Sequence, residues 1–573
     1  MITIIKKCII LENANIPEEI KRLDPKSIEK YCQLLQGKMA KRQHFRLVVV
    51  GPKGSGKTSL VRRILQQPLD KTSEVKSTNG IDIHILKCKI QTKSGKWIFM
   101  EGVTNRQVAN MTLKRCLIAT TSDQDTVRNV DTLGNEDKTS VIKTETSRAR
   151  SRIDESEEIG FKSYKIKSDE IIYSRTKQTE SKKDLAEVLN VKLDENEYAT
   201  IDLWDFAGDR QFYNTHQIFL SKEALYIVTA DMTKDIESIL GIDGEDPNFW
   251  FQSLQYYEQD TMSLCSEPPI ILVGTKMDLC RENDDEASIK LIKMCVPHQS
   301  FRQHIRYFSS LSNTQENNEE VFEKLRDKIF DLAKVSPSWN QEIPVRWIHL
   351  EKTLFELANQ KPIVTKADVI KLGLENLEPI QTDDEVDLFL KYHHETGDFV
   401  YFEDIPEYVV LSPQKLSNAF KCIITSDELQ KFDIASWEQN DWNEIRNTGK
   451  LSNRFIDYLL NKNELSKFKI YILNIMEKYD IIVRSSSASG EENFYVPCMV
   501  ETATDDVDLL FNNKSKTSCL CFVFDFLPRT IFNHVLGACT RRYKVTKKMT
   551  NQCSLKESVY LILMTQVVKN YFY

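Results

Sequence analysis

The chain has 573 residues, of which 41% are hydrophobic and 28% are charged, and its formal net charge is −7. Because a single hydrophobic core stops growing near ~250–300 residues, this length predicts several globular domains. The acidic balance argues against a protein that binds nucleic acid through an overall basic field.

No stretch of the sequence approaches the ~18 consecutive apolar residues of a membrane-spanning helix, so no transmembrane segment is expected. Residues 1–10 carry lysines inside their apolar run and lack a small-residue cleavage site, which is not typical of a signal peptide. The 13 cysteines show no C-x-x-C spacing, which favours reduced thiols over disulfides or zinc ligands. We therefore expect a cytoplasmic protein.

Residues 1–42 allow two interpretations. The segment IPEEI at 16–20, followed by a helix predicted over 27–39, is similar to the end of a leucine-rich repeat array. The same residues also fit an amphipathic helix that packs on the next part of the chain. The sequence alone does not favour either interpretation.

A strand predicted over 45–50 leads into GPKGSGKT at 51–58 and then into a helix. In this context the pattern G-x-x-x-x-G-K-[ST] binds phosphate through backbone N–H groups and the helix N-terminus. Lys57 is expected between the outer phosphates and the Thr58 hydroxyl on Mg²⁺. The candidate nucleotide-binding residues of this loop are Gly51, Gly54, Gly56, Lys57, Thr58 and Ser59.

The loop over 71–80 is rich in threonine and serine. Thr78 is our candidate for the switch threonine that contacts Mg²⁺ and the γ-phosphate, with Thr72, Ser73 and Ser77 as rivals. Beyond it, residues 101–195 have few apolar side chains and many charged and hydroxyl groups. Such a stretch cannot bury enough surface to offset its ordering entropy, so it is predicted to be a mostly disordered insertion.

Strands alternate with helices on both sides of the insertion, which predicts an α/β fold with a parallel-type sheet covered on both faces. The predicted strands are 45–50, 81–90, 97–100, 198–204, 224–230, 270–273 and 305–308, and the predicted helices are 59–65, 212–220, 249–258, 286–295 and 318–334. Ligands of such sheets bind at the carboxyl ends of the strands. Each motif discussed here falls at such an end.

The strand over 198–204 runs into DFAG, which has the pattern D-x-x-G. Asp205 is expected to hold Mg²⁺ through a water, and the Gly208 amide is expected to meet the γ-phosphate. With Thr78 they are the candidate catalytic residues. The candidate metal residues are Thr58, Thr78 and Asp205.

The next motif, TKMD at 275–278, is expected to select the base. An ionised Asp278 accepts hydrogen bonds from N1–H and N2–H₂ of guanine, and adenine offers neither group. Leaving that carboxylate unpaired is costly, so we expect a preference over ATP on the order of 10⁴ or more. The Lys276 stem would pack over the purine. The candidate base-site residues are Thr275, Lys276, Asp278, Ser309 and Ser310.

Asp209 follows Gly208, at a position where many small GTPases have a glutamine that orients the attacking water. An aspartate adds negative charge beside a triphosphate and has no hydrogen to donate. We therefore expect slow intrinsic turnover, or another residue that positions the water. Arg210 is a candidate for neutralising this charge, although a solvent-facing helix start is the favoured interpretation.

Pro337 and Pro344 predict a domain boundary. Beyond it, helices are predicted over 345–356, 365–372, 384–392, 413–424, 465–479 and 528–539, with short strands between them, at 520–524 and at 558–566. His393 and His394 lack a second ligand pair at metal-binding spacing, so we expect them at an exposed helix end.

Three stretches of the sequence resemble the Roco family, in which a Ras-like Roc GTPase domain is joined to a COR region. They are the phosphate loop with STNGID at 77–82, WDFAG at 204–208 leading to YNTHQIFL at 213–220, and IPVRWIHLE at 343–351. Further similar stretches are VLSPQKL at 410–416, MEKY at 476–479 and FLP at 526–528.

The resemblance implies binding and hydrolysis of GTP with Mg²⁺, and a COR region whose first half is winged-helix-like and which forms homodimers. It also implies a larger parent protein with leucine-rich repeats upstream and sometimes a kinase or other domain downstream. The domains expected are an N-terminal adaptor over 1–42, a Roc domain over 43–336, the first half of COR over 337–512 and an incomplete second half over 513–573.

Two functions remain open from the sequence. The favoured one is a GTP-hydrolysing molecular switch of an intracellular signalling protein, whose nucleotide state is coupled to COR-mediated association. The alternative is a scaffold that binds GTP or GDP with little turnover. A winged-helix DNA-binding protein is disfavoured by the acidic balance and the absence of a basic recognition helix.

Overall fold

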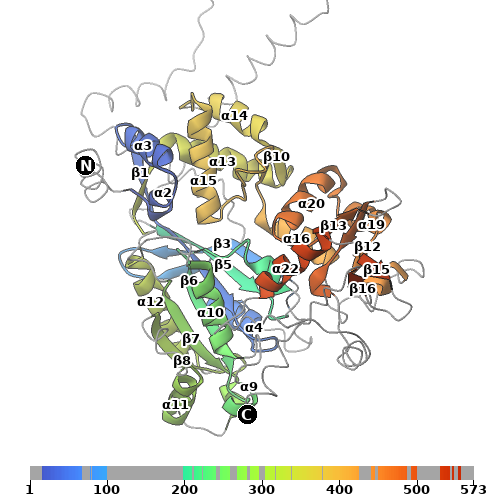
Figure 1. Cartoon of the computed structure of the whole chain (residues 1–573). Coiled ribbons are helices and arrows are strands. Elements are labelled where there is room, and N and C mark those ends of the chain that lie inside the picture. The colour runs from blue at the N-terminus through green and yellow to red at the C-terminus, as the bar shows by residue number, and fades with distance from the viewer. Residues whose placement is uncertain are drawn as a thin grey trace, which may run out of the picture.

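The computed structural model describes residues 16–99, 198–499 and 529–555; the longest gaps inside these ranges are 68–77, 259–267, 296–303 and 425–439. One half of the molecule is an α/β unit, and the other half is formed by the helices and small sheets that follow it (Figure 1). The insertion predicted over 101–195 and the strands predicted over 520–524 and 558–566 lie outside the described residues.

The α/β unit contains a seven-stranded sheet in the order β4-β3-β5-β2-β6-β7-β8. Its strands are β2 (His44–Val50), β3 (Ile81–Gln91), β4 (Trp97–Phe99), β5 (Tyr198–Phe206), β6 (Leu225–Asp231), β7 (Ile270–Thr275) and β8 (Ile305–Ser310). Five strands are parallel, while β3 runs antiparallel to β5 and to β4. The predicted fold class is confirmed, with a mixed sheet of mostly parallel strands.

Helices cover both faces of this sheet because successive side chains of a strand point to opposite faces. Leu47 and Val49 of β2 pack with α4 (Lys57–Ile64) and α12 (Glu319–Lys334). Val48 and Val50 belong to the core on the other face. That second face is covered by α10 (Pro247–Glu258) and α11 (Asp284–Cys295), and the short α9 (Ile236–Ile239) lies nearby.

The helix predicted over 212–220 is wrong in its extent, because α8 covers only Tyr213–His216. After it the chain turns, and the hydroxyl of Tyr226 both donates to the carbonyl of Ser221 and accepts from its amide. Phe219 is buried with its ring 6.2 Å from that of Phe420. Tertiary packing of this segment therefore overrides the helical periodicity.

Residues 16–42 pack on the region that follows the α/β unit. They form α2 (Glu18–Lys21), α3 (Pro25–Leu34) and β1 (Met39–Arg42), and β1 pairs antiparallel with β9 (Gln341–Pro344). Tyr31 packs edge-on against Trp347 with ring centroids 5.8 Å apart, and its hydroxyl donates to the carbonyl of Glu342. This arrangement matches the packed-helix interpretation, and the repeat-array interpretation stays a prediction.

The region after β9 consists of helices with small antiparallel sheets (Figure 1). The helices are α13 (Val345–Ala358), α14 (Lys366–Leu374), α15 (Asp383–Thr396), α16 (Pro413–Ile423), α19 (Asn453–Lys462), α20 (Lys469–Lys478) and α22 (Arg529–Arg542). The strands are β10 (Ile363–Thr365), β11 (Tyr408–Val410), β12 (Lys450–Leu451), β13 (Val483–Ser486), β14 (Glu492–Tyr495), β15 (Val545–Lys547) and β16 (Cys553–Leu555). Among the described residues, no helix is both long and apolar enough to cross a lipid bilayer.

His393 is fully buried, so the predicted exposed helix end is wrong. Helix α15 continues to Thr396, which places His393 inside a cluster of charged groups. Its Nδ1 lies 2.9 Å from the carboxylate of Asp398, which also accepts from Arg42 at 3.0 Å. Arg42 donates to Glu351 as well, at 3.1 Å. These bonds tie β1 to α13 and α15.

His44, Asp202 and Asp398 place potential metal ligands within 4.8 Å of one another beside this cluster. Burial, and then the nearby charge of Arg42, lower the pKa of His44 to about 3, so its imidazole is neutral. The charge of Asp398 is already matched by Arg42, which holds its pKa well below the usual range although burial alone would raise it. We therefore interpret this group as a structural ion-pair network.

Candidate nucleotide-binding site

The phosphate loop connects β2 to α4, as the sequence predicts. Gly51, Gly54 and Gly56 have φ angles of +147°, +73° and +78°, a region that favours glycine. A Cβ atom on Gly51 would lie 2.1 Å from the hydroxyl of Thr229, so no other residue fits there. The loop is therefore shaped by its glycines and by the neighbouring strand β6.

Lys57 is buried, and its ammonium lies over the loop, donating to the carbonyls of Gly51 at 3.0 Å and Pro52 at 2.7 Å. The Ser55 hydroxyl lies 2.8 Å from the carbonyl of Pro52 and 2.7 Å from the hydroxyl of Thr229. These contacts hold the loop in its curved conformation. They also keep the ammonium inside the loop, beside the position expected for phosphate oxygens.

Thr58, Thr78 and Asp205 meet at one point beside the loop. The Thr58 hydroxyl lies 2.5 Å from that of Thr78, and the two hydroxyls donate to Asp205 Oδ2 at 2.6 and 3.0 Å. The rivals of Thr78, which are Thr72, Ser73 and Ser77, lie outside the described residues. The structure thus brings together the three predicted metal residues.

This group of oxygens suits a hard cation. Asp205 Oδ1 is buried without a hydrogen-bond partner in the structure, so the site holds an unsatisfied anionic acceptor. Burial raises the pKa of Asp205 to about 6, although the Thr58 hydroxyl and the charge of Lys57 oppose this. Mg²⁺ prefers carboxylate and hydroxyl oxygens together with phosphate oxygens, so these residues fit the predicted ion.

Gly208 lies against the phosphate loop. A Cβ atom there would be 2.4 Å from the backbone nitrogen of Lys53, and the Gly208 carbonyl accepts from the hydroxyl of Tyr213 at 2.9 Å. Asp209 forms an ion pair with Lys53, with Nζ 2.9 Å from Oδ1. Arg210, the other cation considered for this position, lies outside the described residues.

The TKMD segment follows β7 and contacts the phosphate loop. The Thr275 hydroxyl donates to the carbonyl of Ser55 at 2.7 Å and to that of Ala230 at 3.1 Å. Lys276 has the left-handed φ of +64°, and its ammonium lies 2.6 Å from the carboxylate of Asp231. The Thr275–Ser55 bond joins the TKMD segment directly to the phosphate loop.

The hydroxyls that contact Asp278 come from residues that the sequence analysis missed. Ser312 donates to Oδ1 at 2.6 Å and Thr314 to Oδ2 at 3.1 Å. The predicted residues Ser309 and Ser310 are the last two residues of β8 and precede these hydroxyls in the sequence. The signal available in the sequence was the position of these hydroxyls in the loop after β8. Residues of that loop can reach the end of the neighbouring strand β7, whereas Ser309 and Ser310 still belong to β8.

The segment after Thr78 and the segment after Gly208 both contact the region that follows β9. Helix α16 lies beside the start of β3, where Gln414 donates to the Ile81 carbonyl at 2.9 Å and accepts from the Ile83 amide at 2.8 Å. Lys421 donates to the same Ile81 carbonyl at 3.2 Å. These contacts begin three residues after Thr78.

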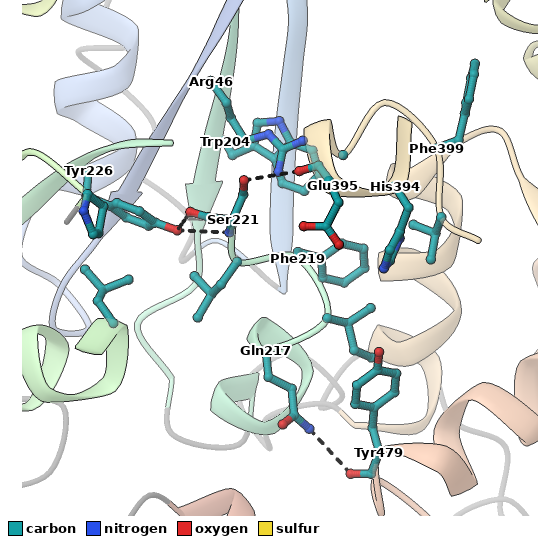
Figure 2. A pocket seen from close by; sticks show the side chains of 16 residues that line it. Arg46, Trp204, Gln217, Phe219, Ser221, Tyr226, His394, Glu395, Phe399 and Tyr479 are labelled. Atoms are coloured by element: carbon teal, nitrogen blue, oxygen red, sulfur yellow. Dashed lines mark hydrogen bonds between the residues drawn. The ribbon is translucent and has the colours of Figure 1, made fainter. Parts of the chain in front are cut away.

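A second contact lies downstream of Gly208, around a cavity of about 190 Å³ (Figure 2). Gln217 donates to the carbonyl of Tyr479 at 3.4 Å, and Ser221 donates to that of Glu395 at 3.2 Å. The Arg46 guanidinium lies 4.4 Å from the ring centroid of Trp204 and packs on Gly397, at the negative C-terminal end of α15.

Two family models match the chain. The model described as "Ras of Complex, Roc, domain of DAPkinase" matches residues 162–278, and the one described as "C-terminal of Roc, COR-A domain" matches residues 344–500. The chain belongs to the Roco family. The Roc match begins after the phosphate loop, so that loop is identified by its own sequence and geometry.

Several curated proteins are similar to the chain. "Probable serine/threonine-protein kinase pats1" from Dictyostelium discoideum is 27% identical over 232 residues, covering 40% of this chain and 7% of the relative. "Cyclic GMP-binding protein C" from the same organism is 25% identical over 234 residues, covering 40% of the chain and 8% of the relative. The chain therefore spans less than a tenth of the length of these two relatives.

A prokaryotic relative of unknown organism, "Roc-COR-CHAT protease", is 22% identical over 344 residues, covering 59% of this chain and 28% of the relative. Among solved structures, "Structure of methanosarcina barkeri Roco2 RocCORdC bound to GDP" covers 82% of this chain and 99% of that chain. Its identity is 17% and its TM-score is 0.45, values too low to bear on the assignment.

The raised pKa of Asp205 predicts how Mg²⁺ affinity depends on pH. The ion needs the ionised carboxylate, so protons compete with it as the pH falls through about 6. The measurement is the Mg²⁺ concentration that halves the release rate of a fluorescent guanine nucleotide, between about pH 5 and pH 7.5.

The nucleotide phosphates also titrate in this range. The Asp205→Asn variant therefore measures the pH dependence of Mg²⁺ affinity that does not come from Asp205. The wild-type plot of log affinity against pH should be steeper than that of the variant by up to about one proton. Equal slopes would show that Asp205 does not hold the ion.

Proposed function

We propose that this chain is a GTP-binding and GTP-hydrolysing switch whose nucleotide state is transmitted to its COR region. The observation that supports it best is the joining of two sites at one edge of the sheet. Thr58, Thr78 and Asp205 form an oxygen cluster beside the phosphate loop. Asp278 lies in the turn directly after β7, and Thr275, the last residue of β7, bonds to that loop.

Guanine specificity follows from Asp278. Its two carboxylate oxygens each accept a hydroxyl hydrogen bond, so they are held in one orientation. Guanine would supply two further N–H donors to these oxygens, whereas adenine would leave the carboxylate without them. The Lys276 side chain, held toward Asp231, supplies an aliphatic stem for the purine face.

For hydrolysis, the residues would bind and orient the triphosphate. Lys57 and the loop amides would hold the outer phosphates, and the Gly208 amide would donate to the γ-phosphate. Mg²⁺, held by Thr58, Thr78 and Asp205, would neutralise charge on the phosphates. Asp209 has no donor to orient water, which supports slow intrinsic turnover.

Coupling to COR would use the contacts made by residues 81–83, after Thr78, and by residues 217–221, after Gly208. A γ-phosphate that draws Thr78 and Gly208 toward itself would change the position of β3 against Gln414 and of residues 217–221 against Tyr479. We assign residues 43–336 to Roc, 337–512 to the first half of COR and 513–573 to its second half.

A larger parent protein that forms homodimers through COR is part of the same proposal. A cytoplasmic location is also part of it, and rests on the cysteine spacing.

The alternative function is a nucleotide-binding scaffold with little turnover. It is favoured by Asp209, whose carboxylate is engaged by Lys53 and whose chemistry differs from that of a water-orienting amide. Hydrolysis rates distinguish the two functions, because both predict nucleotide binding.

Multiple-turnover hydrolysis of GTP tests the switch. Lys57→Ala removes the buried ammonium and should lower the rate about 10²-fold. Lys41→Ala, which removes an exposed lysine of β1, is the matched control and should retain the wild-type rate. Wild-type turnover no faster than that of Lys57→Ala would reject the switch and leave the scaffold.

Gln414→Ala tests the coupling, because it removes the two hydrogen bonds that Gln414 makes to β3, worth about 1–2 kcal/mol together, and keeps the bond from Lys421. Exchange of a non-hydrolysable GTP analogue for GDP should alter hydrogen-exchange protection of α16 in the wild type, and this change should shrink by at least about half in the variant. The exposed Gln360→Ala is the control. An unchanged difference would show that this contact does not transmit the nucleotide state.

A further inference from the structure

Lys53 and Asp209 form an ion pair across the entrance of the phosphate loop. Lys53 is the third residue of that loop, and Asp209 directly follows the Gly208 amide. Their charged atoms are 2.9 Å apart, and their side chains are 37% and 12% exposed. Because the Gly208 backbone packs on that of Lys53, the two side chains lie at the junction of the two segments.

The γ-phosphate would arrive at this junction. Under the proposed function it lies between the Lys57 ammonium, Thr78 and the Gly208 amide, and Lys53 and Asp209 flank that position. A group with two negative charges is attracted by the ammonium of Lys53 and repelled by the carboxylate of Asp209. The intact pair cancels both effects, as it would when only a diphosphate is bound.

We propose that Lys53 is a γ-phosphate sensor that exchanges Asp209 for the γ-phosphate when GTP replaces GDP. With GDP the pair stays closed, and with GTP the ammonium binds the phosphate while the Asp209 carboxylate is released. This inference rests on the proposed function. In this role Asp209 does not need to donate a hydrogen bond, because it binds the Lys53 ammonium until a γ-phosphate replaces it.

The exposure of Lys53, at 37% against 12% for Asp209, makes the exchange feasible. Ion pairs that remain open to solvent change equilibria by only about 2–5-fold, so a phosphate can replace the carboxylate without a large cost. Lys57, in contrast, is buried and bonded to two loop carbonyls, so its ammonium is fixed inside the loop. The two lysines of the loop therefore have different tasks.

The proposal predicts opposite effects of the two single substitutions on triphosphate affinity. Lys53→Ala removes the attraction and leaves the repulsion, so it should weaken a non-hydrolysable GTP analogue about tenfold. Asp209→Ala removes the repulsion and frees the lysine, so it should tighten the analogue about 3–10-fold. Neither should change GDP affinity by more than about threefold. A pair that only holds the loop would give losses of the same sign in both variants.

The experiment measures the dissociation constants of GDP and of the GTP analogue for the full chain, both single variants and the double variant, in Mg²⁺. Lys469→Ala is the matched control, because Lys469 forms an exposed ion pair with Asp457 at 2.7 Å far from the loop. Opposite shifts for the analogue, with GDP affinity retained, support the sensor.

Equal losses for both nucleotides, losses of the same sign for the analogue, or no change in the ratio of the two constants overturn the sensor alone. Failure of the wild type to bind guanine nucleotides would overturn the proposed function together with the sensor.

Discussion

The hydrogen bond from Thr275 to the carbonyl of Ser55 joins two segments that are 220 residues apart in the sequence. It forms because β2 and β7 are parallel strands on either side of β6, so their carboxyl ends reach the same edge of the sheet. The oxygens of Thr58, Thr78 and Asp205 and the carboxylate of Asp278 both depend on this edge. A sheet with β7 reversed would carry the same motifs and have no site.

The segments that follow Thr78 and Gly208 also contact the COR part of the chain. Residues that follow Thr78 contact α16, and residues that follow Gly208 contact Tyr479 and the end of α15. The buried Arg42 network holds β1, α13 and α15 together at the opposite edge, where β2 begins. Side chains that bond to backbone groups therefore link these two segments to COR.

The placement of the phosphate loop, Asp205, Gly208 and Asp278 at one edge of the sheet could be predicted, because motifs of these types stand next to strand ends. Ser312, Thr314 and Gln414 could not, because serine, threonine and glutamine occur widely and only the folded chain brings these hydroxyls and this amide to their partners. The extent of α8 and the burial of His393 were mispredicted for a related reason. Helical periodicity describes one segment, whereas Phe219 packs on Phe420 and His393 lies beside the ion pair that Asp398 forms with Arg42.

The central claim is that one carboxylate and one phosphate loop recognise the same ligand. Competition between GTP and ATP for a fluorescent guanine nucleotide bound to the purified chain tests it most directly. We expect ATP to displace the probe only at concentrations on the order of 10⁴ times those of GTP, and this ratio to collapse in Asp278→Ala. Displacement by ATP and GTP at similar concentrations would contradict the account.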